Sequence, residues 1–353
     1  MSRRTLTEIT AALLAVLLAV LLPGVAAAAP AAASAPIAIV IHGGAGVIER
    51  SKMTAEREAS YRAGLAAALD AGYEVLERGG SSLDAVIAAV KRMEDDPQFN
   101  AGRGAVLDED GAAELDAAIM DGSGPRAGAV AAVRHVKNPI ELARLVMDKS
   151  PHVLLVGDGA EDFALEQGMA LVPRGYFRTE ARMQQLEEAR RVEAARAAGK
   201  PMTRMAPPAA PRSMGTVGAV ALDRAGNLAA ATSTGGLTNK HRGRVGDSPL
   251  IGAGTYANND SCAVSGTGDG EYFIRQVVAY DVCALVQYRH MALAAAVHEV
   301  IQVKLRRTGG EGGLIALDRA GDIAMDFNSA GMFRGARDSR GRREIAMYPE
   351  VGH

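Results

Sequence analysis

A polar, proline-rich segment, Glu180–Arg212, divides the chain and limits how it can fold. Its first part is rich in Glu, Arg and Ala and predicts a polar helix, whereas the part after Gly199 has almost nothing to bury. That part contains Pro201, Pro207, Pro208 and Pro211. We therefore expect a flexible linker over residues 180–215, which separates residues 36–215 from residues 216–353.

The same short turn pattern occurs on both sides of this linker. The pattern Leu-Asp-x-x-Gly occurs three times, each time between small or apolar runs. The copies are Leu107–Gly111, Leu222–Gly226 and Leu317–Gly321. Each copy predicts a β-hairpin, because a polar pair followed by Gly is typical of hairpin turns. Adjacent hairpins favour an antiparallel sheet, and the periodic segments Thr54–Arg78 and Ser81–Met93 predict helices that cover it. The two halves thus predict one α+β domain interrupted by an exposed loop.

Residues 1–35 have the pattern of a secretory signal peptide. Two early arginines precede an apolar run, Ala11–Leu22, that is too short to span a bilayer comfortably. Pro23-Gly24 ends this run, and small residues follow as far as Ala35. We expect this segment to be removed and the protein to be exported to the periplasm. An uncleaved membrane anchor is the alternative.

Charge and composition exclude several classes of partner. Lys and Arg total 39 against 41 Asp and Glu, a net charge of −2, so neither nucleic acid nor, once the signal is removed, a membrane is expected. Aromatic residues are 4% of the chain and Trp is absent, which disfavours stacking platforms for bases or sugars. Two cysteines, Cys262 and Cys283, allow neither a disulfide scaffold nor a cysteine-based zinc site. Oxidation of this pair after export stays open, because the sequence does not show whether they meet.

Motifs for metals and cofactors are weak. Glu94-Asp95-Asp96 is an acidic run without histidine partners and predicts a solvated helix end. Gly266–Gly270 lacks the Gly-Lys-Ser/Thr ending of a phosphate loop. No Gly-x-Ser-x-Gly sequence is present, which argues against a serine esterase. We expect no organic cofactor.

Thr216 directly follows the predicted linker and begins a strand within Gly215–Leu222. The hydroxyl of an internal threonine is a weak nucleophile. Cleavage of the Gly215–Thr216 bond would give this residue a free α-amine of pKa about 7.7–8.0, which could accept the proton of its own hydroxyl. The alternative is a threonine that only starts a strand.

Three polar, glycine-rich segments follow that could serve such a nucleophile. Thr232–Gly236 supplies hydroxyl groups. Arg244 and Asp247 stand three residues apart in the next loop, where Arg can hold an α-carboxylate and Asp can accept from an α-ammonium group. Ser265–Glu271 offers backbone N–H groups and a hydroxyl for an oxyanion hole. A loop-bracing ion pair and a plain glycine turn are the alternatives for the last two segments.

Together these segments resemble the plant-type L-asparaginase and isoaspartyl peptidase family of N-terminal-nucleophile (Ntn) amidohydrolases. The matching blocks run in family order over most of the chain after the predicted signal, and Gly215–Asn259 is the most specific stretch. The blocks are His42–Gly46, Phe99–Gly104, Glu114–Ala117, Met120–Gly122, Gly215–Asp223, Thr232–Lys240, Gly243–Asn259 and Ser265–Glu271. The resemblance implies a four-layer αββα sandwich (the Ntn-hydrolase fold), made from two chains after autocleavage and paired as (αβ)₂.

The resemblance also implies a role for each matching position. Thr216 would be the nucleophile released by autocleavage after Gly215, and Thr234 a second threonine whose hydroxyl contacts it. Thr267 and Gly268 would stabilise the oxyanion. The remaining implied positions are Arg244 at the substrate carboxylate, Asp247 at its amine, Gly268 and Gly270 lining the pocket, and Asn100 near the nucleophile.

A sodium-binding loop is implied as well, formed by main-chain oxygens. Its positions here are Met93, Glu94, Asp96, Phe99, Ala101 and Arg103. Arg103 stands where relatives can carry an apolar residue, which leaves the affinity for the ion open.

The implied activity is hydrolysis of β-aspartyl (isoaspartyl) dipeptides and L-asparagine, which releases L-aspartate through an aspartyl ester on the threonine. Within the family the alternative is a glycosylasparaginase, which cleaves an N-glycan from asparagine. Of another class is a non-catalytic exported amino-acid-binding protein that never matures.

Overall fold

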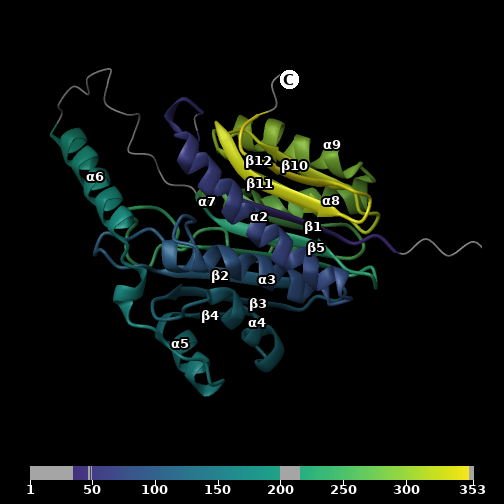
Figure 1. Cartoon of the computed structure of the whole chain (residues 1–353), viewed down its shortest axis with the longest axis horizontal. Helices are drawn as coiled ribbons and strands as arrows, with labels where there is room; N and C mark the ends of the chain where they lie inside the picture. The colour runs from purple at the N-terminus through teal and green to yellow at the C-terminus, as the bar shows by residue number, and fades with distance from the viewer. Residues whose placement is uncertain (1–34, 47, 49, 199–214, 350–353) are drawn as a thin grey trace, which may run out of the picture. The chain divides into compact units, whose positions relative to one another are not determined.

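The computed structural model describes residues 35–46, 48, 50–198 and 215–349 (Figure 1). The predicted signal peptide and the proline-rich part of the predicted linker lie outside the described residues. Within the described part of the chain, no helix is long and apolar enough to cross a membrane.

The larger of two sheets has eight strands and takes them from both sides of the predicted linker. In spatial order they are β12 (Arg343–Ala346), β11 (Gly331–Asp338), β1 (Ala38–Gly46), β5 (Val217–Leu222), β6 (Leu228–Thr234), β2 (Leu115–Asp121), β3 (Ala127–Val133) and β4 (Leu154–Val156). All neighbours are antiparallel except the pair β3–β4. Because β5 and β6 pair between β1 and β2, strands from both sides of the predicted linker share one sheet.

The smaller sheet has four strands and packs against the larger one. Its spatial order is β10 (Ile323–Phe327), β9 (Gly312–Leu317), β8 (Ala263–Gly268) and β7 (Thr255–Ala257). Alternate residues of each strand point to opposite faces. Val40 of β1, Val220 of β5 and Ile315 of β9 therefore share the core between the sheets. Their neighbours Ile39, Ala219 and Leu314 turn outward to the two helical layers.

Helices cover the outer face of each sheet (Figure 1). On the eight-stranded sheet these are α2 (Ala55–Glu77), α3 (Ser82–Asp95) and α4 (Pro139–Lys149), and on the four-stranded sheet α8 (Val278–Arg289) and α9 (Leu293–His298). The remaining helical elements are η1 (Arg50–Lys52), η2 (Gly102–Gly104), α5 (Gly157–Glu166), η3 (Arg174–Phe177), α6 (Glu180–Ala197), α7 (Gly270–Gln276) and the π-helical η4 (Glu299–Leu305). The result is the four-layer αββα sandwich that the resemblance implied.

One aspartate-centred turn recurs in the fold. The N–H of Asp223 donates to the main-chain oxygen of Asn227 at 3.1 Å and closes the β5–β6 hairpin. Asp223 Oδ1 accepts the N–H groups of Ala225 and Asn227, both at 3.0 Å. The same contacts occur at Asp318, between β9 and β10. The predicted hairpins at these two places are confirmed.

Two further copies of this turn differ from the prediction. Asp108 makes the same contacts to Asp110 and Ala112, but its turn does not join two strands, so the hairpin predicted there is wrong. Asp338 forms a fourth copy between β11 and β12. The sequence analysis missed it because a Leu does not precede this Asp.

The first part of the predicted linker is a helix, as expected, but it is tied to the fold. Leu186 and Ala189 of α6 are buried. Arg182 donates hydrogen bonds to the main-chain oxygens of Gly104 at 2.6 Å and Gln98 at 3.2 Å. The helix therefore has more to bury than its composition indicated.

Close contact between α2 and α3 depends on Gly72. A Cβ at this buried position would lie 2.2 Å from Ile39 Cδ1 and 2.9 Å from the main-chain oxygen of Ala85. Gly159, on the exposed side of α5, would have no atom within 4 Å of its Cβ. Replacing each glycine with Ala therefore tests the same substitution at a tightly packed, buried position and at an open, exposed one.

We expect Gly72→Ala to lower the free energy of unfolding by about 1–3 kcal/mol, because the added methyl group overpacks the contact. Gly159→Ala should raise it by up to about 1 kcal/mol, because Ala restricts the unfolded chain and favours the helix. Thermal unfolding of both variants measures the difference. Equal shifts would show that the α2–α3 contact can relax around a methyl group.

Candidate active site

Thr216 lies at the head of β5, in the middle of the eight-stranded sheet. It is 8% exposed, and its Oγ1 lies 3.1 Å from Thr234 Oγ1. The contact follows from the β5–β6 hairpin, whose register pairs Val217 with Ser233. Thr234 Oγ1 also accepts the N–H of Gly236 at 3.0 Å, which fixes its position. The structure therefore brings together the two threonines that the resemblance singled out.

A buried histidine behind Thr216 was not recognised from the sequence. The glycine-rich sequence of His42–Gly46 predicts a loop after a strand, but β1 continues through these residues with a bulge between His42 and Gly44. His42 Nδ1 lies 3.0 Å from the main-chain oxygen of Thr216, and its Nε2 lies 2.9 Å from Ser265 Oγ. The loop interpretation is wrong because the backbone stays paired with β11, despite three glycines in five residues.

Hydroxyl groups continue this contact into the space between the sheets. Ser265 Oγ lies 2.7 Å from Thr232 Oγ1, which accepts from Thr255 Oγ1 at 2.6 Å. The three side chains are fully buried. The arrangement is satisfied when Ser265 donates to His42 Nε2 and His42 Nδ1–H donates to Thr216. A neutral imidazole with its proton on Nδ1 meets this requirement.

Burial also keeps His42 neutral. It lowers the pKa of the imidazole from 6.5 to about 3, although the hydrogen bond to the main-chain oxygen of Thr216 opposes the shift. His42 is therefore a neutral support for the backbone of Thr216 at any pH near 7.

Asn100 lies beside the predicted cleavage bond. A Cβ on Gly215 would lie 2.9 Å from Asn100 Cβ. The Asn100 side chain donates from Nδ2 to the oxygen of Gly236 at 2.8 Å and accepts from the N–H of Val106 at 2.9 Å. It therefore holds the loop after β6, which carries the N–H that fixes Thr234.

Thr267, a candidate oxyanion residue, lies near the same strand ends. Its buried Oγ1 accepts the N–H of Ala45 at 3.1 Å. The register of β1 and β5 pairs His42 with Gly218, so the chain around Ala45 runs alongside Thr216. The next residue, Gly268, has no room for a Cβ, which would lie 2.6 Å from the oxygen of Glu311. Thr267 thus approaches the head of β5 from the opposite sheet.

Arg244 and Asp247 both lie against Gly270. A Cβ on Gly270 would lie 2.8 Å from Arg244 Nη2 and 3.0 Å from Asp247 Oδ1. Asp247 is buried, and its Oδ2 has no hydrogen-bond partner among the described residues. Burial raises the pKa of Asp247 to about 7, against the opposing effects of its own N–H and the Arg244 charge. An ammonium group placed beside this carboxylate would restore its negative charge.

Further charged groups contact the loop that carries Arg244 and Asp247. The buried Glu114 forms an ion pair with the partly exposed Arg134 and accepts the N–H of Gly243 at 2.7 Å. The buried Lys240 donates to the main-chain oxygen of Glu114 at 3.0 Å. Asp116 is fully buried, and burial raises its pKa against the nearby Lys240 charge. The sequence analysis missed these roles, because burial and pairing across strands have no local signal.

Two of the main-chain oxygens implied as sodium ligands, those of Glu94 and Phe99, lie beside η2. A Cβ on Gly102 would lie 2.4 Å from the oxygen of Glu94, and one on Gly104 would lie 2.1 Å from the oxygen of Phe99. Only glycine at positions 102 and 104 allows the carbonyl groups of Glu94 and Phe99 to lie so close to the backbone of η2. Uncharged oxygen ligands of this kind suit a hard cation, so the residues present fit the implied ion. No cluster of three or more His, Cys, Asp or Glu side chains that could bind a metal is found among the described residues.

The acidic run beside this loop is not a solvated helix end, at least at Glu94. This residue is fully buried. Its Oε1 accepts from Ser233 Oγ at 2.7 Å and from the N–H of Ile140 at 3.1 Å. Burial raises the pKa of Glu94 to about 8. The earlier interpretation fails because β6 and α4 cover the end of α3.

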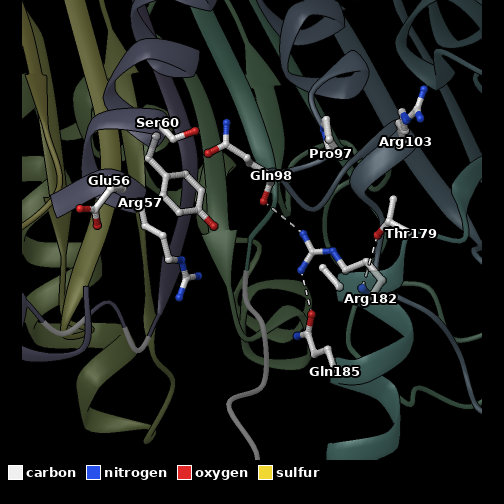
Figure 2. Close-up of a pocket in the computed structure, with 11 residues that line it drawn as sticks. Glu56, Arg57, Ser60, Pro97, Gln98, Arg103, Thr179, Arg182 and Gln185 are labelled. Carbon is white, nitrogen blue, oxygen red and sulfur yellow. Dashed lines mark hydrogen bonds between the residues drawn. The ribbon is translucent and has the colours of Figure 1, made fainter. Parts of the chain in front are cut away.

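A cavity of about 680 Å³ lies beside α2, α6 and the loop around η2, and neither Thr216 nor Thr234 lines it (Figure 2). It is lined by the start of α2, residues 97–103 and the start of α6. Figure 2 shows Arg182 turned toward Gln98 and Gln185, while Arg57 and Arg103 extend in other directions. The guanidinium groups do not converge, so the cavity shows no built anion site.

The four-layer sandwich with a threonine at the head of a central strand defines the Ntn-hydrolase class. The chain belongs to the asparaginase family, whose sequence profile matches residues 35–347. It is 55% identical over 298 residues to an isoaspartyl peptidase of Salmonella typhimurium, covering 84% of this chain and 93% of that protein. An isoaspartyl peptidase of Escherichia coli is 52% identical over 316 residues, covering 89% and 97%. A mouse isoaspartyl peptidase/L-asparaginase is 44% identical over 300 residues, covering 84% and 86%. The protein is thus a hydrolase of this family.

We expect the neutral His42 to make stability fall with acidity. Its pKa is about 3 in the folded state against 6.5 ordinarily, so the unfolded state binds the proton first as the pH falls. Each pH unit below 6.5 should cost the native state about 1.4 kcal/mol relative to the unfolded chain. His42→Asn should remove this dependence, whatever its stability at pH 7.

Chemical denaturation of both proteins between pH 7 and pH 5 measures this difference. The raised pKa values of Glu94 and Asp247 act with the opposite sign but are common to both proteins, so they cancel. Parallel stability curves would mean that His42 is protonated without penalty.

Proposed function

We propose that the protein is an autoprocessing amidohydrolase that cleaves β-aspartyl dipeptides and L-asparagine to release L-aspartate. One observation carries the proposal. The hydroxyl of Thr216 is held against Thr234 at the head of a central strand, directly after the residue where the resemblance places the cut. The printed names of the relatives, isoaspartyl peptidase and isoaspartyl peptidase/L-asparaginase, support the same activity.

Maturation would begin with attack of Thr216 Oγ1 on the carbonyl carbon of Gly215. The Gly215–Thr216 C–N bond breaks as the ester bond forms, and the proton of the hydroxyl passes to the released amine. Water then hydrolyses the ester and leaves Thr216 as a free N-terminus. The product would be an α chain ending at residue 215 and a β chain of residues 216–353, with α6 near the end of the former.

In turnover the free α-amine of Thr216 would accept the proton of its own hydroxyl, which attacks the side-chain carbonyl of the substrate. The amine then protonates the leaving amino group, and an aspartyl ester remains on the threonine. Thr267 and the N–H of Gly268 would stabilise the oxyanion, while Arg244 and Asp247 hold the α-carboxylate and α-ammonium groups. Water releases L-aspartate.

The two alternatives are less well supported. The relatives described above are named for isoaspartyl peptidase and asparaginase activities, which disfavours a glycosylasparaginase. A non-catalytic amino-acid-binding protein would have no need for a nucleophile held by a second hydroxyl at the predicted cut. Both alternatives are decided by the same preparation of purified protein.

We expect the purified protein to separate into two chains on a denaturing gel, with Thr216 at the start of the smaller chain. Thr216→Ala should stay as one chain and release no aspartate from β-Asp-Leu, because it lacks the attacking oxygen. Thr216→Ser keeps that oxygen and serves as the control, which should still be cleaved. Intact-mass analysis with an aspartate assay measures both properties. A cleaved, active Thr216→Ala protein would falsify the mechanism.

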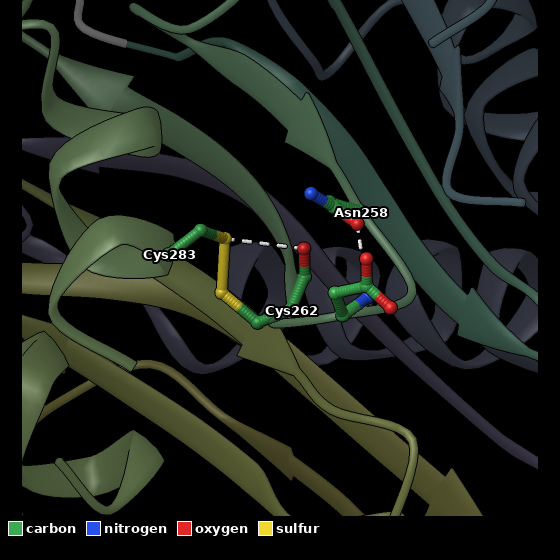
Figure 3. The surroundings of a disulfide bond; sticks show 4 residues. Asn258, Cys262 and Cys283 are labelled. Carbon is green, nitrogen blue, oxygen red and sulfur yellow. Dashed lines mark hydrogen bonds between the residues drawn. A yellow bond between two sulfur atoms is a disulfide. The ribbon is translucent and has the colours of Figure 1, made fainter. Parts of the chain in front are cut away.

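We also propose export to the periplasm, as the pattern of residues 1–35 predicts. A disulfide between Cys262 and Cys283, with a Cα–Cα distance of 5.4 Å, supports an oxidising destination (Figure 3). It joins the start of β8 to α8, and both cysteines are buried. The described residues contain no free cysteine. The pair thus meets, which the sequence left open.

Expression of the full chain in a Gram-negative host is expected to place the mature protein in the periplasmic fraction with both thiols blocked. Replacing both cysteines with Ala should lower the free energy of unfolding by about 3 kcal/mol, because the bond closes a loop with a sequence separation of 21 residues. Fractionation, thiol labelling and denaturation measure these properties. Uncleaved protein confined to the cytoplasm, with two reactive thiols, would contradict the export proposal.

Two further properties are proposed from the resemblance. A structural sodium ion would bind the main-chain oxygens around η2 and stiffen the loop that carries Asn100, and its loss in sodium-free buffer would lower the thermal midpoint. The chains would assemble as (αβ)₂, a state that the mass in solution tests directly. Neither property changes the chemistry proposed for Thr216.

A further inference from the structure

One edge of the Arg244 guanidinium is held by a carboxylate of the same chain. Arg244 Nε donates to Glu271 Oε1 at 3.0 Å, and Arg244 Nη2 donates to Glu271 Oε2 at 3.1 Å. The side chain of Arg244 is 17% exposed and that of Glu271 is 55% exposed. A bidentate pair of this kind fixes the plane of the guanidinium as well as its position.

The other edge of the guanidinium lies close to glycine residues. A Cβ on Gly246 would lie 2.9 Å from Arg244 Nη1, and one on Gly236 would lie 3.4 Å from the same atom. On Gly270 the Cβ would lie between Arg244 Nη2 and Asp247 Oδ1. A side chain at Gly246 or Gly270 would therefore press against the Nη1/Nη2 edge, and Asp247 lies beside this edge with a carboxylate that could pair with an ammonium group.

Glu271 also links this arginine to the oxyanion segment. It lies in the first turn of α7, four residues after Thr267 at the end of β8. The segment between them is held by the N–H of Asp269, which donates to the oxygen of Glu311 at 2.9 Å. The same stretch of chain thus sets both the candidate oxyanion donors and the orientation of Arg244.

We infer that Glu271 is a positioning residue for substrate recognition, which holds the Nε/Nη2 edge of Arg244 so that its Nη1/Nη2 edge receives the α-carboxylate of a β-aspartyl substrate. This inference rests on the proposed function. It assigns Glu271 no contact with the reacting atoms, so its effect falls on substrate binding and not on the chemical step.

The opposite role would give the opposite sign. If Glu271 occupied the edge that the substrate needs, then each substrate would have to displace it, and removing its charge would strengthen binding. Kinetics of Glu271→Gln on the matured enzyme separate the two roles. The amide N–H₂ of Gln opposes one of the two arginine N–H groups, so the bidentate pair cannot form while the side-chain volume stays the same.

We expect Glu271→Gln to raise KM for β-Asp-Leu and L-asparagine by roughly tenfold or more, with kcat changed by less than about threefold. The reason is that a misplaced Arg244 guanidinium weakens binding of the substrate's α-carboxylate. The inhibition constant of L-aspartate should rise in parallel. β-Alaninamide, which is L-asparagine without its α-carboxylate, should be turned over equally by both enzymes. A general structural defect would reduce turnover of all three substrates.

Glu344→Gln is the matched control. Glu344 accepts a hydrogen bond from Arg342 at 2.5 Å on the edge strand β12, and it belongs to no part of the proposed site. This variant should keep wild-type KM values. If Glu271→Gln fails to mature, Glu271→Asp, which is one methylene too short to hold both N–H groups, should show the same loss confined to KM.

The outcomes distinguish the inference from the proposed function. A wild-type enzyme that is cleaved but releases no aspartate from β-Asp-Leu contradicts the proposed function. An active wild-type enzyme with an unchanged or lower KM in Glu271→Gln overturns the inference alone, and a lower KM assigns Glu271 as a competitor of the substrate. Equal losses with β-alaninamide and L-asparagine would also overturn it.

Discussion

The pairing of β5 between β1 and β6 is the constraint on which the rest of the structure depends. It places Thr216 at the head of a strand that pairs with β1, from the other side of the predicted linker, and with β6, the next strand along the chain. The same register sets His42 beside Gly218, where a Cβ would lie 2.0 Å from Ser265 Oγ. The absence of a side chain at this one position allows the histidine and the hydroxyls of the second sheet to meet behind the threonine.

The ionisable groups of the site differ in how deeply they are buried. His42 is fully buried and kept neutral by burial. Asp247 is also buried and has a pKa of about 7, so a small change in its surroundings decides its charge. Arg244 and Glu271 lie nearer the solvent and pair directly. This order suits a site that must stay folded with few buried charges and yet bind a zwitterion.

Much of the fold and of the candidate site could be predicted from local patterns. Asp and Gly at fixed spacing indicated the turns after Leu222 and Leu317, because an Asp side chain closes the same turn wherever it occurs. Caps and apolar periodicity placed α2 and α3. Thr216, Thr234 and Arg244 were named from motifs. In contrast, His42–Gly46 was mistaken for a loop, because its pairing with β11 comes from residues almost 300 positions away.

By itself, the sequence indicated most of the turns, the helices α2 and α3, and the residues named as candidates for the chemistry. Only the tertiary structure decided what each polar group meets. The Glu94 carboxylate is buried against Ser233, 139 positions later, and the two cysteines join across 21 positions. Glu271 holds Arg244 through a contact 27 residues apart in the chain. The reason is physical: hydrogen bonds, burial and pKa depend on distances in space, which a local pattern does not contain.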